Sequence, residues 1–168
     1  RAHGFEEIHE DEMVAPVHPD SIATDLGTFQ IRPMLAREFP GIRRPLLAYV
    51  SRGTYDADDR EIASWIDTDA YRPFVATRDG TIVGYAENNV HHRWLSGTSF
   101  ARVERVVVDP SARRNGLARQ LVAALIRDAH SIACRRIELQ VHDPSARRIY
   151  EGLGFVATGN PMFAKTLS

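Results

Sequence analysis

The hydrophobic and polar positions of the chain predict a mixture of strands and helices. Alternating or continuous apolar runs bounded by turn residues predict strands at 28–32, 74–78, 81–90, 100–108, 137–141, 155–158 and 162–167. Apolar residues at helical spacing predict helices over 117–129 and 144–152, and a helix pair or broken helix over 35–52 and 56–67. Asp79-Gly80 between two of the strands is a strong hairpin signal. We therefore expect an α/β (α+β) three-layer sandwich with helices flanking a mixed sheet.

The first 27 residues lack a clean period. They carry five acids, Glu6, Glu7, Glu10, Asp11 and Glu12, followed by Pro16 and Pro19. Such a composition favours an acidic tail or loosely attached arm. We therefore expect residues 28–168 to form one domain, which suits a chain of 168 residues.

Composition narrows the classes of function. The formal net charge of −1 argues against a broad nucleic-acid surface, and no apolar run approaches the roughly 20 residues of a membrane span. No secretory signal is visible, and the lone Cys134 excludes an internal disulfide. These features predict a cytoplasmic protein without a nucleic-acid or membrane partner, and they leave a homodimer open.

One stretch predicts an anion site. Three valines, 106–108, read as a buried strand; Asp109-Pro110 ends it, and a basic loop then leads through Gly116 into a helix. A helix N-terminus presents unpaired N–H groups and a partial positive charge, which suit phosphate. The motif is neither a nucleoside-triphosphate loop nor a dinucleotide fingerprint. The plainer alternative is an ordinary strand–turn–helix with solvated arginines.

The same stretch resembles a known family. Arg113-x-x-Gly116-x-Ala118, after Val-Val-Val-Asp-Pro, resembles the acetyl-CoA signature of the GNAT N-acetyltransferase superfamily. A second block, 138–155, is similar to the family's strand and helix that end in L-Y-E-x-x-G-F. The resemblance is strong over 100–158 and plausible over 28–99. It implies the GNAT fold, with a sheet splayed between the strands at 100–108 and 137–141 and the cofactor in the gap.

The resemblance also implies the residues that bind coenzyme A. Main-chain groups along the strand would meet the pantetheine arm, and the helix-start loop would hold the pyrophosphate. The residues concerned are Val106, Val107, Val108, Arg113, Arg114, Asn115, Gly116, Leu117, Ala118 and Arg119. Asp143 stands where the family commonly has asparagine, so its contact with the cofactor is in doubt and helix N-capping is its securest role.

Three residues are candidates for proton transfer. Tyr150 matches the family tyrosine that protonates the departing thiolate, and the alternative role is packing. Glu104, which we expect on the same strand face as Val106, ranks above Glu87 as the base. An edge salt bridge is the alternative for each glutamate. His91 and His92 lack metal-pair spacing and are expected in a loop on the acceptor side, so we predict no metal site.

The resemblance therefore implies an acetyl-CoA-dependent N-acetyltransferase. The acetyl group would move to a primary amine by direct attack in a ternary complex, with a small-molecule amine favoured over a protein amino group. The alternative is a coenzyme A-binding sensor or scaffold of the same fold that does not turn over. The sequence does not identify the acceptor.

Overall fold

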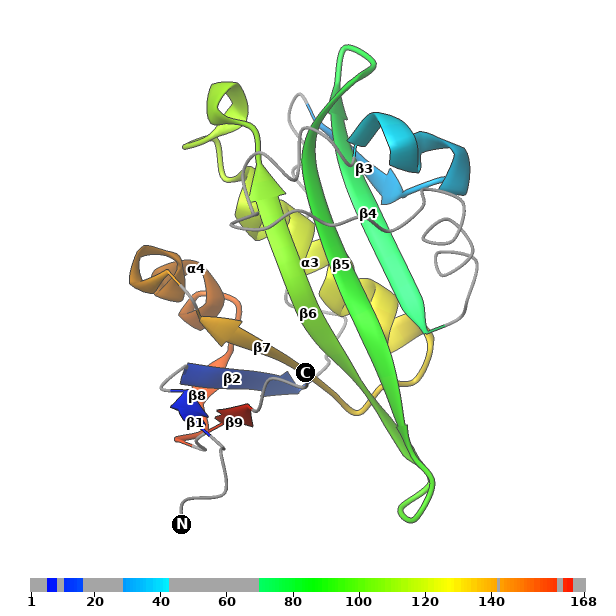
Figure 1. Cartoon of the computed structure of the whole chain (residues 1–168). Helices are drawn as coiled ribbons and strands as arrows, with labels where there is room; N and C mark the ends of the chain where they lie inside the picture. The colour runs from blue at the N-terminus through cyan, green and yellow to red at the C-terminus, as the bar shows by residue number, and fades with distance from the viewer. Residues whose placement is uncertain are drawn as a thin grey trace.

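The fold is built around a seven-stranded mixed sheet. The computed structural model describes residues 6–8, 11–16, 29–42, 70–141, 143–159 and 162–164. Its sheet has the order β3-β4-β5-β6-β7-β2-β8, and every pair is antiparallel except β6 and β7 (Figure 1). The strands are β2 (Asp11–Pro16), β3 (Gln30–Pro33), β4 (Tyr71–Arg78), β5 (Thr81–Arg93), β6 (Thr98–Val108), β7 (Arg136–Val141) and β8 (Val156–Ala157). A separate pair joins β1 (Glu6–Ile8) to β9 (Met162–Ala164).

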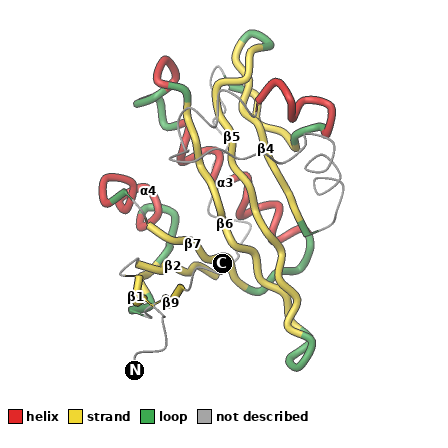
Figure 2. The backbone as a smooth tube through the Cα atoms, in the orientation of Figure 1, coloured by secondary structure: helices red, strands yellow, loops and turns green. Residues whose placement is uncertain are grey.

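Helix α3 (Leu117–Ser131) covers one face of the sheet (Figure 2). Its buried stripe includes Leu117, Leu121 and Leu125, which are almost completely excluded from water. Gly84 on β5 lies beneath this stripe, and a Cβ atom there would come within 3.0 Å of Leu121 Cδ1. The helix can therefore approach β5 closely because residue 84 has no side chain.

The opposite face carries a second, smaller core. Phe39 and Ile42, which follow the short 3₁₀ helix η2 (Ala36–Glu38), pack with Met34, Val75 and Tyr85. The chain is helical over 39–42. Helical segments therefore lie on both sides of the sheet, as the predicted three-layer architecture requires.

The sheet forks between its two parallel strands. β6 and β7 pair from Phe100↔Arg136 to Val103↔Leu139 and then diverge (Figure 1). At the base of the fork, the buried Glu138 carboxylate, 1% exposed, accepts hydrogen bonds from Arg102 of β6 at 2.6 Å and from Arg136 of β7 at 2.9 Å. The ion pairs thus join the two strands where the fork begins.

Most of the predicted elements are confirmed where the structure describes them. Asp79 and Gly80 have φ angles of 52° and 77°, as the two central residues of a type I′ hairpin require. After β7, the predicted helix is a 3₁₀ turn, η4 (Pro144–Ala146), that continues into α4 (Arg147–Glu151). The helix predicted over 56–67 and the end of the 35–52 segment lie outside the described residues.

The N-terminal segment differs from the expected loose arm. β2 lies inside the sheet between β7 and β8, with Met13 1% exposed in the main core. Its partner strands are more than a hundred residues away, so no local pattern indicates the pairing. A strand of six residues also offers too few apolar positions for a period to be read.

Candidate active site

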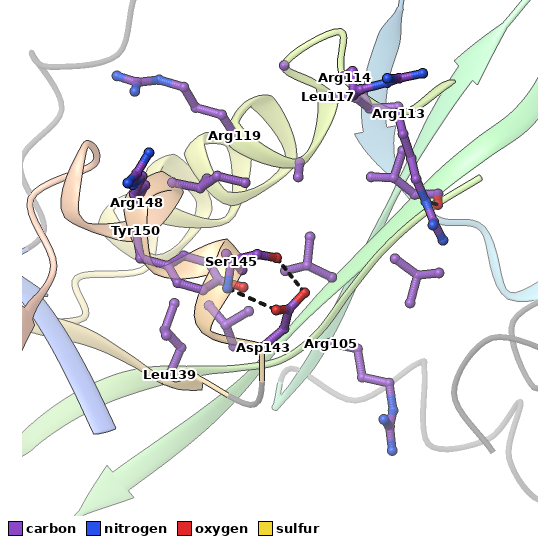
Figure 3. Close-up of a pocket in the computed structure, with 18 of the residues that line it drawn as sticks. Arg105, Arg113, Arg114, Leu117, Arg119, Leu139, Asp143, Ser145, Arg148 and Tyr150 are labelled. Atoms are coloured by element: carbon purple, nitrogen blue, oxygen red, sulfur yellow. Dashed lines mark hydrogen bonds between the residues drawn. The ribbon is translucent and has the colours of Figure 1, made fainter. Parts of the chain in front are cut away.

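A cavity of about 960 Å³ fills the open part of the fork (Figure 3). One wall is the upper part of β6 with the loop that follows, and the opposite wall is β7 with η4 and α4. All the residues predicted to bind coenzyme A line it except Asn115, and so do two of the three proton-transfer candidates, Glu104 and Tyr150. The lining is positive overall, because it has five arginines and two acids. These are Arg105, Arg113, Arg114, Arg119 and Arg148, with Glu104 and Asp143.

The loop before α3 exposes the N-terminus of the helix to the cavity. Asp109 caps the 3₁₀ turn η3 (Pro110–Ala112) by accepting from Ser111 N at 2.8 Å. Arg114 and Gly116 both adopt positive φ, 63° and 74°. No side chain caps α3, and a Cβ on Gly116 would meet no atom within 4 Å. Gly116, Leu117 and Ala118 line the cavity, so the start of α3 borders it, as an anion site requires.

The upper part of β6 is an open strand edge. Asp109 N donates to Val83 O at 2.9 Å, so the main-chain groups of Val106 and Val108, by strand alternation, point away from β5 and toward the gap. In the described chain, no β7 residue pairs with β6 beyond Val103. One edge acceptor is already engaged, because Arg113 Nε donates to Val108 O at 3.0 Å and its side chain lies along the strand (Figure 3).

Arg119 connects the two walls of the cavity. Its guanidinium donates to Gly152 O at the end of α4, at 3.0 Å. A cation beside the last carbonyls of a helix is favourable. This arginine therefore holds α3 and α4 together while it adds positive charge to the cavity.

Tyr150 enters the cavity from α4 (Figure 3). Its ring packs edge-on against Phe155, with centroids 6.0 Å apart, and no hydrogen bond joins its hydroxyl to a described residue. Burial raises the pKa of Tyr150 above its usual value, and the nearby Asp143 carboxylate raises it further. The hydroxyl is thus protonated at neutral pH and has a proton to donate.

Asp143 is the N-cap of η4. Its carboxylate accepts from Ser145 N at 2.9 Å and from Ser145 Oγ at 2.7 Å (Figure 3). These hydrogen bonds, the hydroxyl's foremost, lower the pKa of Asp143. The capping role expected from the sequence is therefore present, and the carboxylate adds negative charge to the lining of the cavity.

Glu104 lies at a β-bulge. Glu87 pairs with Arg105 and Asn88 with Val103, so Glu104 is the extra residue on β6. The bulge interrupts the two-residue alternation, so simple spacing from Val106 does not fix the face of Glu104, although both residues line the cavity. Its side chain is exposed and lines the cavity.

Glu87 occupies a different environment. It is 7% exposed, on the sheet face opposite α3, and does not line the cavity. The hydroxyls of Tyr71 and Tyr85 both donate to its Oε2, and these hydroxyls lie 2.7 Å from each other. Burial raises the pKa of Glu87, while the two tyrosines oppose that rise. The structure therefore separates the two glutamates that the sequence ranked together.

A second cavity, of about 510 Å³, lies on that opposite face. Segment 37–42, the β4–β5 turn and Tyr85 line it, and Val107 borders both cavities. No pattern in the sequence indicated this cavity. The tyrosine cluster could have been suspected, because Tyr85 and Glu87 are two residues apart and so share a strand face.

The three histidines in the described residues, His91, His92 and His130, lie away from the cavities. His91 and His92 extend β5, so they are not in the expected acceptor-side loop, and His130 is exposed on the surface. His142 lies outside the described residues. Within the described ranges, no group of three or more histidine, cysteine or acidic side chains could hold a metal ion. No helix in the same ranges is long and apolar enough to cross a membrane.

Known proteins share this sequence pattern and fold. An aminoglycoside N(6′)-acetyltransferase type 1 of Salmonella typhimurium is 28% identical over 128 residues, which cover 73% of this chain and 86% of the relative. A mycothiol acetyltransferase of Thermobispora bispora is 30% identical over 118 residues, covering 67% of this chain and 39% of the relative. The solved structure of AAC(6′)-Iy with a bisubstrate analogue, CoA-S-monomethyl-acetylneamine, superposes with a TM-score of 0.71 at 24% identity, covering 84% of this chain and all of that one.

A crystal structure of a Trypanosoma brucei acetyltransferase has the same TM-score, 0.71, at 23% identity, covering 82% of this chain and 99% of that one. These likenesses confirm the predicted fold. The model of the Acetyltransferase (GNAT) family matches residues 30–155. This range contains both arms of the fork and the basic loop between them, so the chain belongs to the GNAT acetyltransferase family.

Proposed function

We propose that this chain transfers the acetyl group of acetyl-CoA to a primary amine by direct attack in a ternary complex. The observation that carries the proposal is the fork cavity. A phosphate-suited helix N-terminus, an open strand edge and a protonated tyrosine hydroxyl all face this one space. A cofactor with a diphosphate, an amide-bearing arm and a thioester matches these three features in order.

The loop and the strand edge would bind the cofactor. The N–H groups at 116–118 would bind the pyrophosphate, with Arg114 and Arg119 adding charge. Val106 and Val108 would pair with the pantetheine arm as an added strand pairs with a sheet edge. The Val108 N–H would also stabilise the carbonyl oxygen in the transition state, a contribution of about 3 kcal/mol in other acyl transfers.

The reaction requires two proton movements. The amine nitrogen forms a bond to the thioester carbon, the carbon–sulfur bond breaks, and sulfur leaves with the electron pair. Tyr150 would donate a proton to this thiolate, and Glu104 would accept the proton lost by the attacking nitrogen, directly or through water. Exposure at the cavity favours Glu104 over Glu87, whose Oε2 is already hydrogen-bonded to two tyrosines.

The acceptor would approach from the second cavity. That cavity borders the first across Val107, and its size of about 510 Å³ suits a small molecule. Two of the relatives are named as an aminoglycoside N(6′)-acetyltransferase and a mycothiol acetyltransferase. We therefore propose a small molecule that bears a primary amine, with amino sugars as the first candidates.

The alternative is a coenzyme A-binding sensor without turnover. Asp143 favours it, since its carboxylate stands where an amide is common in the family and adds negative charge beside the cofactor site. Binding and turnover have to be measured separately to distinguish the two functions.

The test combines calorimetric titration with coenzyme A and a free-thiol release assay. Acetyl-CoA is incubated with aminoglycosides, simple amino sugars, polyamines and amine-terminated peptides in turn. Acceptor-dependent thiol release with one of the small amines supports the proposal. Binding of coenzyme A without thiol release from any acceptor would favour the sensor, and absence of binding would refute both.

A further inference from the structure

A buried cluster of three polar side chains lies on the sheet face opposite α3. It joins Tyr71 of β4 to Tyr85 and Glu87 of β5. Glu87 is 7% exposed and Tyr85 is 3% exposed, whereas Tyr71 is half-buried. The acetyl transfer steps described above leave all three side chains without a role.

The cluster lies between the two cavities. Tyr85 lines the second cavity and pairs with Val107, which borders both cavities. Glu87 pairs with Arg105, which lines the first cavity. Side chains of paired residues share a sheet face and lie about 5 Å apart. An acceptor that crosses Val107 from the second cavity to the first would therefore pass Tyr85.

The oxygen atoms of the cluster are arranged to take up one proton. The hydroxyls of Tyr71 and Tyr85 each donate to Glu87 Oε2, and the two hydroxyl oxygens lie 2.7 Å apart. With an ionised carboxylate, two protons serve three contacts, because each hydroxyl has one proton to donate. A third proton, on Glu87, would let each oxygen donate to the next around the triangle. Proton uptake therefore completes the contact between the two hydroxyls.

The surroundings of Glu87 also favour uptake of a proton. Burial raises the pKa of Glu87, although the hydrogen bonds from the two tyrosines oppose the rise. Of the charged neighbours on β6, Arg105 lowers this pKa and Glu104 raises it. Burial also raises the pKa of Tyr71 and that of Tyr85. Both hydroxyls are therefore protonated at neutral pH, and they can pass a proton on without holding a charge.

We propose that Tyr85 and Glu87 form a relay that takes one of the two protons lost by the acceptor nitrogen, and that Tyr71 returns this proton to solvent. The inference rests on the proposed function and deepens it. A primary ammonium loses one proton before it attacks and a second after the carbon–nitrogen bond has formed. Glu104, which is exposed at the cavity, takes the first of these protons, and the relay takes the second.

The relay step conserves atoms and charge. The positively charged nitrogen releases its proton to Tyr85 Oη and keeps the electron pair, while the original hydroxyl proton moves to Glu87 Oε2. The nitrogen becomes neutral, and the carboxylate becomes a neutral acid. Glu87 then donates a proton to Tyr71, and the half-exposed Tyr71 hydroxyl gives its own proton to water. The carboxylate is thereby restored for the next turnover.

The test measures turnover with the aminoglycoside or amino sugar that gives the fastest thiol release. Glu87→Gln can still accept from both tyrosines, and Tyr85→Phe keeps the aromatic ring. Each should lower kcat about 100-fold, with the KM for the amine within about threefold. The double variant should be no slower than the slower single variant, because both changes break one path. Thr77→Val, which removes a buried hydroxyl away from both cavities, is the matched control and should keep the parent's kcat.

A pH profile separates the relay from a purely structural role. Above the pKa of the amine, solvent has already removed the first proton. Raising the pH should therefore restore kcat in Glu104→Gln but not in Glu87→Gln. Restoration of kcat in Glu87→Gln, or additive losses in the double variant, would overturn the relay.

Infrared spectroscopy tests the cluster without turnover. The difference between parent and Glu87→Gln spectra should contain a protonated carboxyl band that titrates at higher pH than an exposed glutamate. A band that titrates as an exposed glutamate does would overturn the relay. Full transfer activity in Glu87→Gln would overturn the relay alone, whereas a parent that transfers acetyl to no amine would overturn the proposed function and the relay with it.

Discussion

Replacement of Gly116 tests the anion site most directly, because two substitutions of nearly equal shape differ only in charge. Gly116 has φ of 74° and open space in front of its Cα. Asparagine and aspartate tolerate this conformation better than other residues, and the cost for each is about 1–2 kcal/mol or less. Both are also good N-caps, and aspartate gains further from the helix dipole. The aspartate variant should therefore be at least as stable as the asparagine variant.

Binding of coenzyme A should show the opposite order. A carboxylate about 5 Å from a phosphate charge opposes it by about 1–3 kcal/mol, depending on the local dielectric. Gly116→Asp should therefore raise the dissociation constant of coenzyme A at least about tenfold relative to Gly116→Asn. Isothermal titration measures both constants, and thermal unfolding measures both stabilities. The difference should shrink in about 1 M salt, because the charges are screened.

Equal affinity of the two variants would refute the assignment of the diphosphate to this helix. If Gly116→Asp binds coenzyme A more weakly than Gly116→Asn but is also less stable, the charge argument loses its support. Capping predicts the reverse order of stability. The asparagine variant thus controls for bulk and backbone strain in one step.

Three further outcomes are expected. Tyr150→Phe should lower kcat by about 100-fold or more, while the KM for acetyl-CoA stays within about threefold because the packing on Phe155 is kept. Burial raises the pKa of Tyr150, so the rate of the unmodified protein should show no loss from ionisation of this tyrosine below about pH 10. Glu104→Gln should lower kcat/KM most at low pH, where the amine is most protonated; an unchanged pH profile would remove Glu104 as the base. Glu138→Gln should lower the urea unfolding free energy by about 2–3 kcal/mol, because it leaves two arginines without their carboxylate. Glu151→Gln is the control for both glutamate variants, because this exposed carboxylate has a 3.9 Å ion pair with Arg147. A similar loss of kcat/KM or of unfolding free energy in Glu151→Gln would contradict the role given to Glu104 or to Glu138.

Local signals predicted elements that border the two cavities. Asp79-Gly80 indicated the hairpin, Asp143 the cap of the helix that carries Tyr150, and Gly116 the start of α3. Each signal depends on residues within a few positions of one another. Backbone conformation and capping are short-range effects, so the sequence alone contained them.

Local sequence signals could not predict the bulge at Glu104 or the cluster of tyrosines around Glu87. A bulge is a property of two strands in register, and the register of β5 with β6 changes between Glu87 and Asn88. Tyr71 comes from another strand, sixteen residues before Glu87 in the chain. Periodicity within β6 assumed regular alternation, which the bulge interrupts, so spacing alone could not relate Glu104 to Val106.

The sequence by itself determined the phosphate-suited loop, the helix that follows it and the position of Tyr150, because turn chemistry and helical spacing are local. Only the tertiary structure decided that β2 joins the sheet, that β6 and β7 part above Glu138, and that one glutamate is buried while the other faces the cavity. Those outcomes depend on which distant strands pair and in what register. Pairing of that kind is set by the burial of the whole sheet, and no short window of residues specifies it.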